Sequence, residues 1–330
     1  MIKIGLLGAG FMGGTHFAAY KQLLHKGGFK VTAVADLDKK KLEKAASELG
    51  VKAYANADEL LNNADINVAD ICLPTYLHYE YAMKAVDKGY NVFVEKPLCL
   101  TGAQAESLAG AADKKGVISM VGQCIRFWDE YVYLKKLVDE KTYGAVSTAH
   151  FRRLSPRPTW GWKDWLLKMK KSGGAAFDLH IHDTDYMLYL FGEPQKIKSV
   201  INKTGEKNGY IMSVCSYGDF VVTTEGTWNL PASYSFEMYY RVVFENAVVE
   251  FSSKSGVTVY DDKGASVPAI QKACQTGGAS GGNISDLGGY YNELDYFIDC
   301  LKNGKKAATA SLPEGARSVK LAEKELKSKL

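Results

Sequence analysis

Cysteine is scarce in this chain of 330 residues, and its six cysteines lie far apart. They have neither the paired spacing of a zinc site nor the density of a disulfide scaffold, so we expect reduced thiols and no metal. No apolar run reaches the roughly 18 residues that a membrane-spanning helix needs. The first predicted strand begins at Ile2, which leaves no room for a secretory leader. We therefore expect a cytoplasmic protein.

The sequence also lacks a strong excess of one charge, since 41 Lys and Arg residues stand against 37 Asp and Glu residues. The basic runs at 39–44 and 168–171 fall in helical stretches and are typical of solvated helix faces. A nucleic-acid-binding surface would need these charges to be clustered. We expect neither a nucleic-acid nor a membrane partner. At this length we expect two domains.

The first 122 residues alternate apolar runs with helical patterns. Asp38 is a predicted N-cap of a helix that stops at Gly50, and Thr101 with Gln104 forms a capping box for a helix that ends near Gly116. Apolar runs of the kind that form buried parallel strands occupy 2–7, 31–35, 68–73, 91–94 and 117–121. This alternation predicts an α/β domain with a doubly wound parallel sheet.

Residues 123–330 are predicted to form a second α/β domain with a mainly antiparallel sheet. Strand-like segments follow one another from 195 to 260 without intervening helices. In 236–244, apolar side chains alternate with polar ones, so one face of the sheet is apolar, and we expect a second copy of the chain to cover it. Helices are predicted over 129–140, 178–190, 290–301 and from 312 onward, with a Gly- and Ser-rich loop over 276–289.

A glycine-rich turn, Gly8-Ala9-Gly10-Phe11-Met12-Gly13, directly follows the first strand and opens a helical segment. Glycines at this spacing permit a tight turn and a close approach of the backbone to a pyrophosphate at the helix N-terminus. Asp36 ends the second strand, where a carboxylate accepts hydrogen bonds from ribose hydroxyls and repels a 2′-phosphate. The pattern predicts a dinucleotide site that prefers NAD to NADP. Asp36 or the nearby Asp38 could instead simply cap the next helix.

Glu95-Lys96-Pro97 follows the fourth apolar run and completes a set of motifs by which the chain resembles the Gfo/Idh/MocA (glucose-fructose oxidoreductase and inositol dehydrogenase) family. The other motifs are Gly8 to Gly13, Leu73-Pro74-Thr75 with His78, Arg126-Phe127, and Gly173-Gly174 through Asp178, His182 and Asp185 to Gly192. Thr75 and Cys124 depart from asparagines that are frequent in relatives.

The resemblance implies a Rossmann domain followed by a domain with an open-faced sheet, often the subunit interface, and thus a homodimer or homotetramer. It also implies a sugar or polyol substrate. The residues that it implies at the cofactor are Gly8, Gly10, Phe11, Met12, Gly13, Asp36, Leu73, Pro74, Thr75, His78, Glu95 and Lys96.

Oxidation of a secondary alcohol needs a base, a positive group that stabilises the alkoxide, and a nicotinamide beside the carbon. Lys96 lies just past the carboxyl end of a parallel strand, where such sheets bind ligands, and is the predicted positive group. Asp178, His182 and Asp185 are spaced by four and three, so a helix would present them on one face. His182 is the predicted acid or base, Asp178 orients it or binds substrate, and Asp185 contacts substrate or caps local backbone. We expect substrate to bind between the domains.

Trp160 and Trp162 lie in an irregular stretch near Arg152. They could form the wall of a polyol pocket by stacking on its CH face, or the stretch could simply pack on the sheet. We expect Arg126 and Arg152 to contribute to substrate binding as well.

These observations predict an NAD-dependent oxidoreductase acting on a secondary-alcohol carbon of a sugar or cyclitol. One alternative is a reductase of a keto-sugar or nucleotide-sugar, in which Arg152, Arg153 and Arg157 hold a phosphate. Another is a non-catalytic NAD-sensing regulator, which predicts the loss of the catalytic groups, yet Lys96 and His182 are present.

Overall fold

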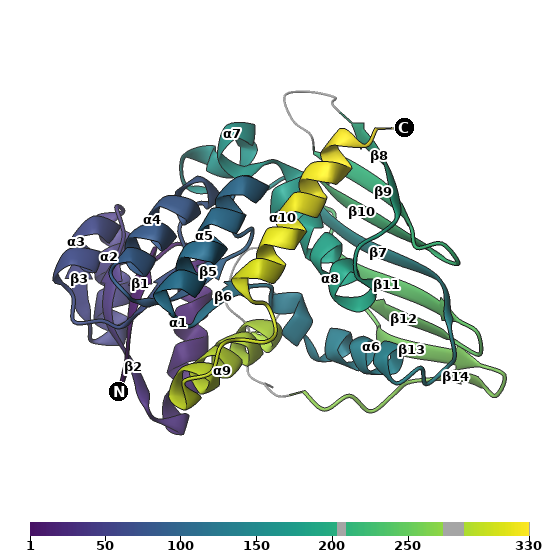
Figure 1. Ribbon diagram of the computed structural model, residues 1–330, viewed down its shortest axis with the longest axis horizontal. Helices are drawn as coiled ribbons and strands as arrows, with labels where there is room; N and C mark the ends of the chain where they lie inside the picture. The colour runs from purple at the N-terminus through teal and green to yellow at the C-terminus, as the bar shows by residue number, and fades with distance from the viewer. Residues whose placement is uncertain (203–208, 273–286, 330) are drawn as a thin grey trace. The chain divides into compact units, whose positions relative to one another are not determined.

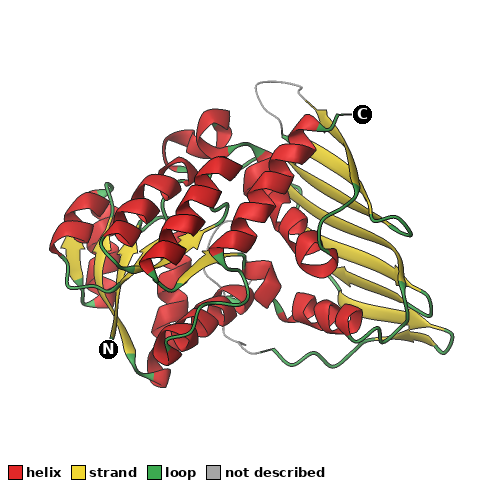
Figure 2. Cartoon of the chain, in the orientation of Figure 1, coloured by secondary structure: helices red, strands yellow, loops and turns green. Residues whose placement is uncertain are grey.

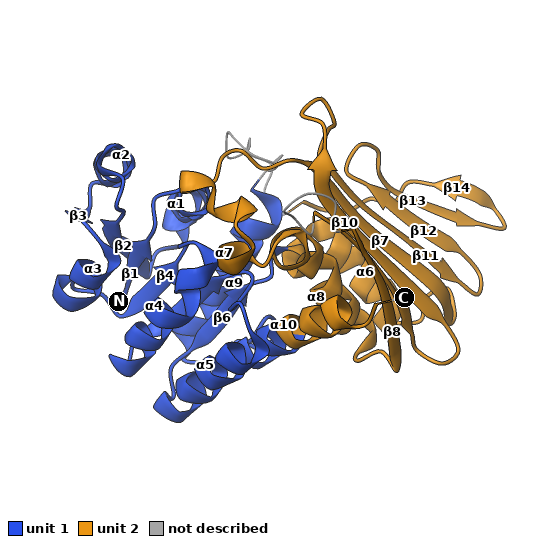
Figure 3. Ribbon diagram, turned by 90° about the horizontal axis from the view of Figure 1, so that it is seen from above, with its two compact units in different colours: residues 1–124, 274–317 blue, residues 125–273, 318–330 orange. Residues whose placement is uncertain are grey.

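The computed structural model describes residues 1–202, 209–272 and 287–329, and these fall into two compact units (Figure 3). Unit 1 contains residues 1–124 with the described part of 274–317, and unit 2 contains 125–272 with 318–329. The predicted division at residue 122 treated the domains as consecutive. The chain instead returns to unit 1 because helix α9 (Gly288–Asn303) packs against α1 (Phe11–Leu23). Most of the predicted loop over 276–289 lies outside the described residues.

Unit 1 is a six-stranded sheet in the order β3-β2-β1-β4-β5-β6, with every neighbouring pair parallel. The predicted doubly wound sheet is thus confirmed. Helices α1 and α9 lie on one face of the sheet, and α4 and α5 lie on the other (Figures 1 and 3). The strands are β1 (Ile2–Leu7), β2 (Phe29–Ala35), β3 (Lys52–Tyr54), β4 (Val68–Ile71), β5 (Asn91–Glu95) and β6 (Ser119–Gly122). The helices between them are α2 (Lys39–Leu49), α3 (Ala57–Asn63), α4 (Thr75–Asp87) and α5 (Gly102–Lys115).

The predicted helix caps of unit 1 are present. The Asp38 side chain accepts hydrogen bonds from two backbone N–H groups of α2, and Thr101 accepts one from Gln104 at the start of α5. Gly50 and Gly116 end these helices in the left-handed conformation. Strand β3 was not predicted, because a three-residue edge strand with two exposed side chains carries no periodic signal. Helix α3, which follows it, was not predicted either.

Unit 2 contains an eight-stranded sheet in the order β14-β13-β12-β11-β7-β10-β9-β8. Its neighbouring strands are antiparallel except for β7 and β10, which are parallel. The strands are β7 (Val146–Pro156), β8 (Lys196–Asn202), β9 (Tyr210–Ser216), β10 (Val221–Leu230), β11 (Glu237–Phe244), β12 (Val248–Ser252), β13 (Gly256–Asp261) and β14 (Gly264–Ser266). The helices are α6 (Asp129–Asp139), α7 (Met169–Ser172), α8 (Ile181–Phe191) and α10 (Leu312–Lys327), which enters this unit at Ser318.

Helices of the same unit cover the apolar face of this sheet (Figure 2). Tyr131 of α6 and Tyr186 of α8 pack edge to face at 4.9 Å between ring centroids, and Tyr131 also meets Tyr240 of β11 at 5.3 Å. The prediction that a second copy of the chain covers this face was therefore wrong. The opposite face, which we call the open face, contains Val200, Val214, Val221 and Tyr260, each 38–45% exposed. Among the described residues, no helix has the length and apolar character needed to cross a membrane.

The glycines of the turn between β1 and α1 serve different purposes. Gly8 has a φ of +101°, and a Cβ on it would lie 2.6 Å from the carbonyl oxygen of Cys72. A Cβ on Gly13 would lie 1.9 Å from the carbonyl oxygen of Gly8. The φ of Gly10 is an ordinary −72°, and a Cβ there would meet no described atom within 4 Å. The fold therefore requires Gly8 and Gly13, whereas Gly10 leaves open space at the N-terminus of α1.

Two alanine substitutions should separate these purposes. We expect Gly13→Ala to lower the free energy of unfolding by about 3 kcal/mol, because the new methyl group collides with backbone. Gly10→Ala should cost less than about 1 kcal/mol, since it alters only a helix N-cap. It should nevertheless weaken NAD binding by filling the open space. Urea unfolding and calorimetric titration of both variants measure the two effects, and equal stability losses would contradict the distinction.

Candidate active site

The residues after the strands of unit 1 meet at one edge of the sheet, because parallel pairing aligns the carboxyl ends. Asp36 lies at this edge, where its Oδ2 accepts a hydrogen bond from the N–H of Ala9 and its Oδ1 accepts one from the N–H of Asp38, each at 2.7 Å. The capping role belongs to Asp38, so Asp36 binds the glycine turn instead. Each carboxylate oxygen has a further lone pair for a ribose hydroxyl. The open space at Gly10, the start of α1 and this carboxylate fit a dinucleotide.

The other predicted cofactor residues divide into exposed and enclosed groups. Phe11 and Met12 begin α1 and are partly exposed, as is Leu73, which precedes Pro74 at the N-cap position of α4. Thr75 and His78 are buried, at 2% and 1% exposure. The enclosed pair can act on a ligand only by holding the turn that contacts it.

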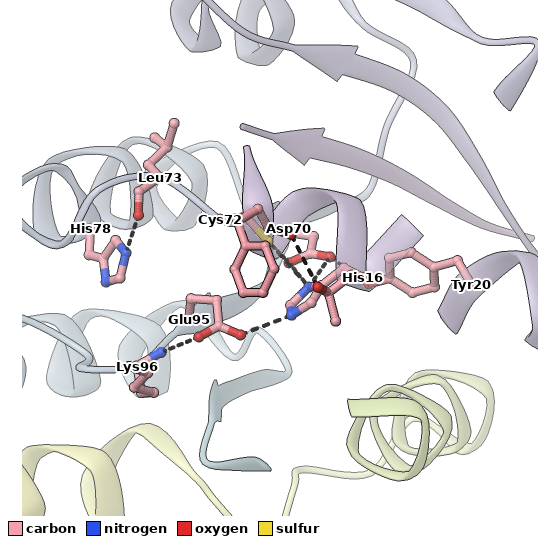
Figure 4. A network of polar contacts seen from close by, with 10 residues as sticks. His16, Tyr20, Asp70, Cys72, Leu73, His78, Glu95 and Lys96 are labelled. Atoms are coloured by element: carbon pink, nitrogen blue, oxygen red, sulfur yellow. Dashed lines mark hydrogen bonds and ion pairs between the residues drawn. The ribbon is translucent and has the colours of Figure 1, made fainter. Parts of the chain in front are cut away.

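His78 connects two turns at this edge (Figure 4). Its Nε2 lies 2.7 Å from the carbonyl oxygen of Leu73, and its Nδ1 lies 2.8 Å from that of Pro97. Two carbonyl acceptors favour the cationic ring, but burial is the larger effect and the pKa of His78 lies below its ordinary value. We therefore infer a neutral ring that donates to one carbonyl at a time.

Glu95-Lys96-Pro97 forms the turn after β5, and the Lys96–Pro97 peptide is cis. Lys96 is partly exposed, whereas Glu95 is buried at 3% exposure. Glu95 was predicted as a cofactor contact, but its Oε1 faces the buried ring of His16 at 2.9 Å and its Oε2 accepts the N–H of Lys96 at 3.0 Å. Glu95 thus points into the protein and holds the backbone N–H of Lys96 (Figure 4).

Two residues near this edge were not predicted from the sequence, His16 and Gln123. His16 lies on α1 and is fully buried. The sequence signal for a buried partner was the charged residue Asp70 within the otherwise apolar strand β4. Gln123 directly follows β6 and, by the pairing of Glu95 with Gly122, is level with Lys96. Its side-chain amide is buried and has no hydrogen-bond partner among the described residues.

In unit 2 the predicted helix over 178–190 begins as a π-helical turn, Ala176–His180, and continues as α8. Asp178 lies in the π turn and is partly exposed, and His182 lies in the first turn of α8 at 7% exposure. His180, only two residues before His182, contacts a different helix. Its Nε2 lies 3.1 Å from Oε1 of Glu325 on α10. A Cβ on Gly226 of β10 would lie 2.7 Å from the Cβ of His180, so a glycine lets this turn approach the sheet.

Asp185 and Arg126 form a buried ion pair with each other. The Nε and Nη2 of Arg126 donate to the two carboxylate oxygens of Asp185 at 2.7 and 2.8 Å, and Ser318 donates to Oδ1. Asp185 is 0% exposed and Arg126 is 4% exposed. Arg126 was predicted to bind substrate, and Asp185 to contact substrate or cap local backbone. The structure instead pairs the two charged groups with each other inside the protein.

Arg152 lies on the open face, opposite the face against which α8 packs. Its guanidinium lies over the Tyr239 ring at 4.6 Å and forms an ion pair with Glu237 at 2.5 Å. Side chains alternate along β7, so Arg152 and its neighbour Phe151 point to opposite faces, and Phe151 contacts Tyr186 of α8. The structure therefore does not bring Arg152 to the side of the sheet that holds His182, and this position does not support its predicted role in substrate binding.

The two tryptophans remain accessible. Trp160 is 40% exposed and Trp162 is 36% exposed, in the segment between β7 and α7. The rest of each indole is covered, so both interpretations, a pocket wall and packing of the stretch, fit this exposure. Lys163 contacts the Trp162 ring at 4.5 Å, which leaves the indole near a positive charge.

Two family models match the chain. The model of the Gfo/Idh/MocA oxidoreductase family with an NAD-binding Rossmann fold matches residues 2–123, and the model of the Gfo/Idh/MocA C-terminal domain matches residues 131–250. Together they cover most of the sequence, and they meet close to the boundary between the two units.

Individual relatives agree with the family models. The chain is 28% identical over 322 residues to the scyllo-inositol 2-dehydrogenase (NAD(+)) of Bacillus subtilis (strain 168), covering 92% of this chain and 87% of that protein. It is 30% identical to the 2,7-anhydro-N-acetylneuraminate hydratase of Mediterraneibacter gnavus over 58% of this chain, and spans about half the length of that relative. A solved levoglucosan dehydrogenase in complex with NADH and levoglucosan superposes with a TM-score of 0.83 at 21% identity, covering 99% of this chain and 96% of that one. The glycine turn, the Glu95-Lys96-Pro97 turn and both matched domains show that this chain belongs to the Gfo/Idh/MocA oxidoreductase family.

Proposed function

We propose that this protein transfers hydrogen between NAD and a secondary-alcohol carbon of a sugar or cyclitol. The observation that carries the proposal is the edge of the parallel sheet in unit 1, where the open space at Gly10, the Asp36 carboxylate and Lys96 occur together. Relatives named for inositol and levoglucosan support the substrate class.

The chain supplies three groups to this reaction. His182 accepts the proton of the substrate hydroxyl, since imidazole titrates near neutral pH. Lys96 stabilises the negative charge that grows on the oxygen as the O–H bond breaks. Asp178, one turn before His182, binds substrate hydroxyls or orients the imidazole. Bound NAD+ would accept the electron pair and hydrogen of the C–H bond, so that the alcohol becomes a ketone and one proton remains on His182.

The contacts of the arginines bear on the alternatives. A nucleotide-sugar or phosphorylated substrate was favoured by Arg152, Arg153 and Arg157. Arg152 pairs with Glu237 on the open face, and Arg153 is buried against Asp183 at 3.2 Å, so two of the three arginines are already paired with carboxylates of the protein. Trp160 and Trp162 are partly exposed, and an indole ring suits the CH face of an uncharged polyol.

Asp36 should set the preference for NAD. We expect the wild-type protein to bind NADH about 10-fold or more tightly than NADPH, because the carboxylate repels a 2′-phosphate. Asp36→Ala should narrow this ratio. The matched control is Asp38→Ala, which removes a helix cap worth about 1 kcal/mol but leaves the ratio unchanged. Fluorescence titration of both cofactors measures the ratios, and NADPH binding at least as tightly as NADH would refute the assignment.

The catalytic assignments predict distinct kinetic defects on whichever polyol proves active in a screen for NAD reduction. Lys96→Ala should lower kcat by about 10²- to 10³-fold while NAD still binds, because the lysine acts on charge that grows only during the reaction. His182→Ala should lower kcat and flatten the rise of rate with pH through the neutral range. His25→Ala, an exposed histidine on another helix, is the control. If His182→Ala kept wild-type turnover and pH dependence, the imidazole would not be the base.

We further propose a cytoplasmic homo-oligomer. The described cysteines are all free and buried, as in proteins of a reducing compartment. The surface that supports self-association is the open face. There Val200, Val214 and Val221 on adjacent strands form an exposed apolar patch.

Light scattering should therefore give a multiple of the 36.2 kDa chain mass at micromolar concentration. Val214→Glu should reduce the measured mass by placing a charge within the patch. Val267→Glu, at a valine that is 77% exposed outside the strands, should leave the measured mass unchanged. A wild-type species of 36.2 kDa alone would exclude the proposal.

A further inference from the structure

A buried cluster of ionisable side chains lies in unit 1 behind the Glu95-Lys96-Pro97 turn (Figure 4). We call it the His16 cluster, and its members are His16, Asp70, Cys72, Glu95 and Glu293, each at most 9% exposed. The imidazole bridges two carboxylates, with Nδ1 2.9 Å from Oδ2 of Asp70 and Nε2 2.9 Å from Oε1 of Glu95. An imidazole can donate both of these hydrogen bonds only as a cation.

The surroundings of His16 support this charge state. Burial alone would lower its pKa, but the Asp70 carboxylate, through its charge and its hydrogen bond, more than offsets burial, so the pKa lies well above its ordinary value. Burial and Asp70 raise the pKa of the Cys72 thiol, which stays neutral. Tyr20 donates a hydrogen bond to Asp70 at 2.8 Å. The ring of His16 is therefore held as a cation between two fully enclosed anions.

Glu293 enters the cluster from α9 and is 0% exposed. One of its oxygens, one of Glu95 and a nitrogen of His16 all lie within 4.8 Å of one another. Neither oxygen of Glu293 has a hydrogen-bond partner among the described residues. Burial first, and then the Glu95 carboxylate, raise the pKa of Glu293 well above its ordinary value. A second bare carboxylate at this place would be strongly unfavourable, so Glu293 holds a proton at neutral pH.

Glu95 transmits the arrangement of the cluster to the lysine. One of its oxygens is held by His16, and the other accepts the backbone N–H of Lys96 at 3.0 Å. Gly122 on the adjacent strand makes room for this side chain, since a Cβ there would lie 3.0 Å from Oε1. His16 itself lies on α1, the helix that starts at the glycine turn. The cluster thus connects α1 to the backbone of Lys96 through two charged hydrogen bonds.

We propose that the His16 cluster is a positioning device that fixes the Glu95 carboxylate and thereby the orientation of Lys96, with His16 and Glu293 as positioning residues. The inference rests on the proposed function only for the use made of Lys96. The connection to the lysine backbone and the protonation of Glu293 are testable without turnover. A buried divalent cation held by His16, Glu95 and Glu293 is the competing interpretation, and the experiments below distinguish the two.

The first experiment tests the charge states through stability. His16 and Glu293 both have a raised pKa in the folded protein, so their contribution to stability is present below their ordinary pKa values and is lost as pH rises through the raised values. Glu293→Gln resembles the protonated acid and should keep the Tm at neutral pH within a few degrees. The Tm of Glu293→Gln should also decrease less between neutral pH and about pH 9 than the Tm of the wild type does. Asp295→Asn, which removes a partly exposed acid from the same helix, should leave the slope unchanged.

Two results, one from metal analysis of the purified protein and one from the Tm measurements, would overturn the proposal. One is a stoichiometric divalent metal in the purified wild-type protein that Glu293→Gln loses. The other is a drop of more than about 10 °C in the Tm of Glu293→Gln with Asp295→Asn unaffected, because it would show that Glu293 is ionised and bonded in the fold.

The second experiment tests positioning with a double-mutant cycle. His16→Gln should lower kcat about 10-fold or more in the wild-type background, but less than about 3-fold in the Lys96→Ala background, because its effect passes through the lysine. NAD affinity measured by calorimetry should change less than kcat does. His25→Gln, near the end of the same helical segment, should change neither. Equal losses in the two backgrounds would contradict positioning and leave a general structural role.

A third readout needs no substrate. The rate at which an acylating reagent modifies Lys96, followed by peptide mass spectrometry, should differ between His16→Gln and wild type and be equal for His25→Gln and wild type. If no polyol is oxidised but this rate changes, the proposed function fails and the positioning network stands. If wild type is active and the rate of Lys96 modification in His16→Gln equals that of wild type, the network fails and the function stands.

Discussion

Parallel pairing aligns the carboxyl ends of β1, β2, β4, β5 and β6, and every candidate cofactor group of unit 1 depends on that alignment. Each strand contributes a short turn rather than a catalytic side chain within the strand, because the strands themselves are buried on both faces. The glycine turn, Asp36 and Lys96 are far apart in sequence, yet they follow strands that end at the same level. The chemistry is therefore assigned to residues that lie just beyond the strand ends.

Buried charges organise both units, and each is paired in a way that suits its position. In unit 1 a cationic His16 lies between two carboxylates. In unit 2 Arg126 binds Asp185 through two hydrogen bonds. Such pairs gain little net stability over well-packed apolar groups, but loss of one partner leaves an uncompensated charge that costs about 3–5 kcal/mol. They therefore hold the geometry of nearby turns more than they raise the stability of the fold.

The sheet of unit 2 shows how one strand can serve two surfaces. Alternation along β7 sends Phe151 to the helix-covered core and Arg152 to the open face. The aromatic side chains on the covered face pack against α6 and α8, so that face needs no partner. The open face combines ion pairs with exposed valines, a composition suited to association with another protein surface.

The sequence by itself determined the parallel sheet of unit 1, the caps at Asp38 and Thr101, and the dinucleotide pattern, because apolar periodicity, glycine spacing and capping are local properties. Only the tertiary structure decided which polar residues face a ligand and which face each other. Arg126 was predicted at the substrate, and Asp185 at the substrate or at a backbone cap, but the two pair with each other within the core. His16 and Glu293 were not predicted at all. The physical reason is that a buried charge is defined by its partner, and such partners are brought together from distant segments by packing that no local pattern records.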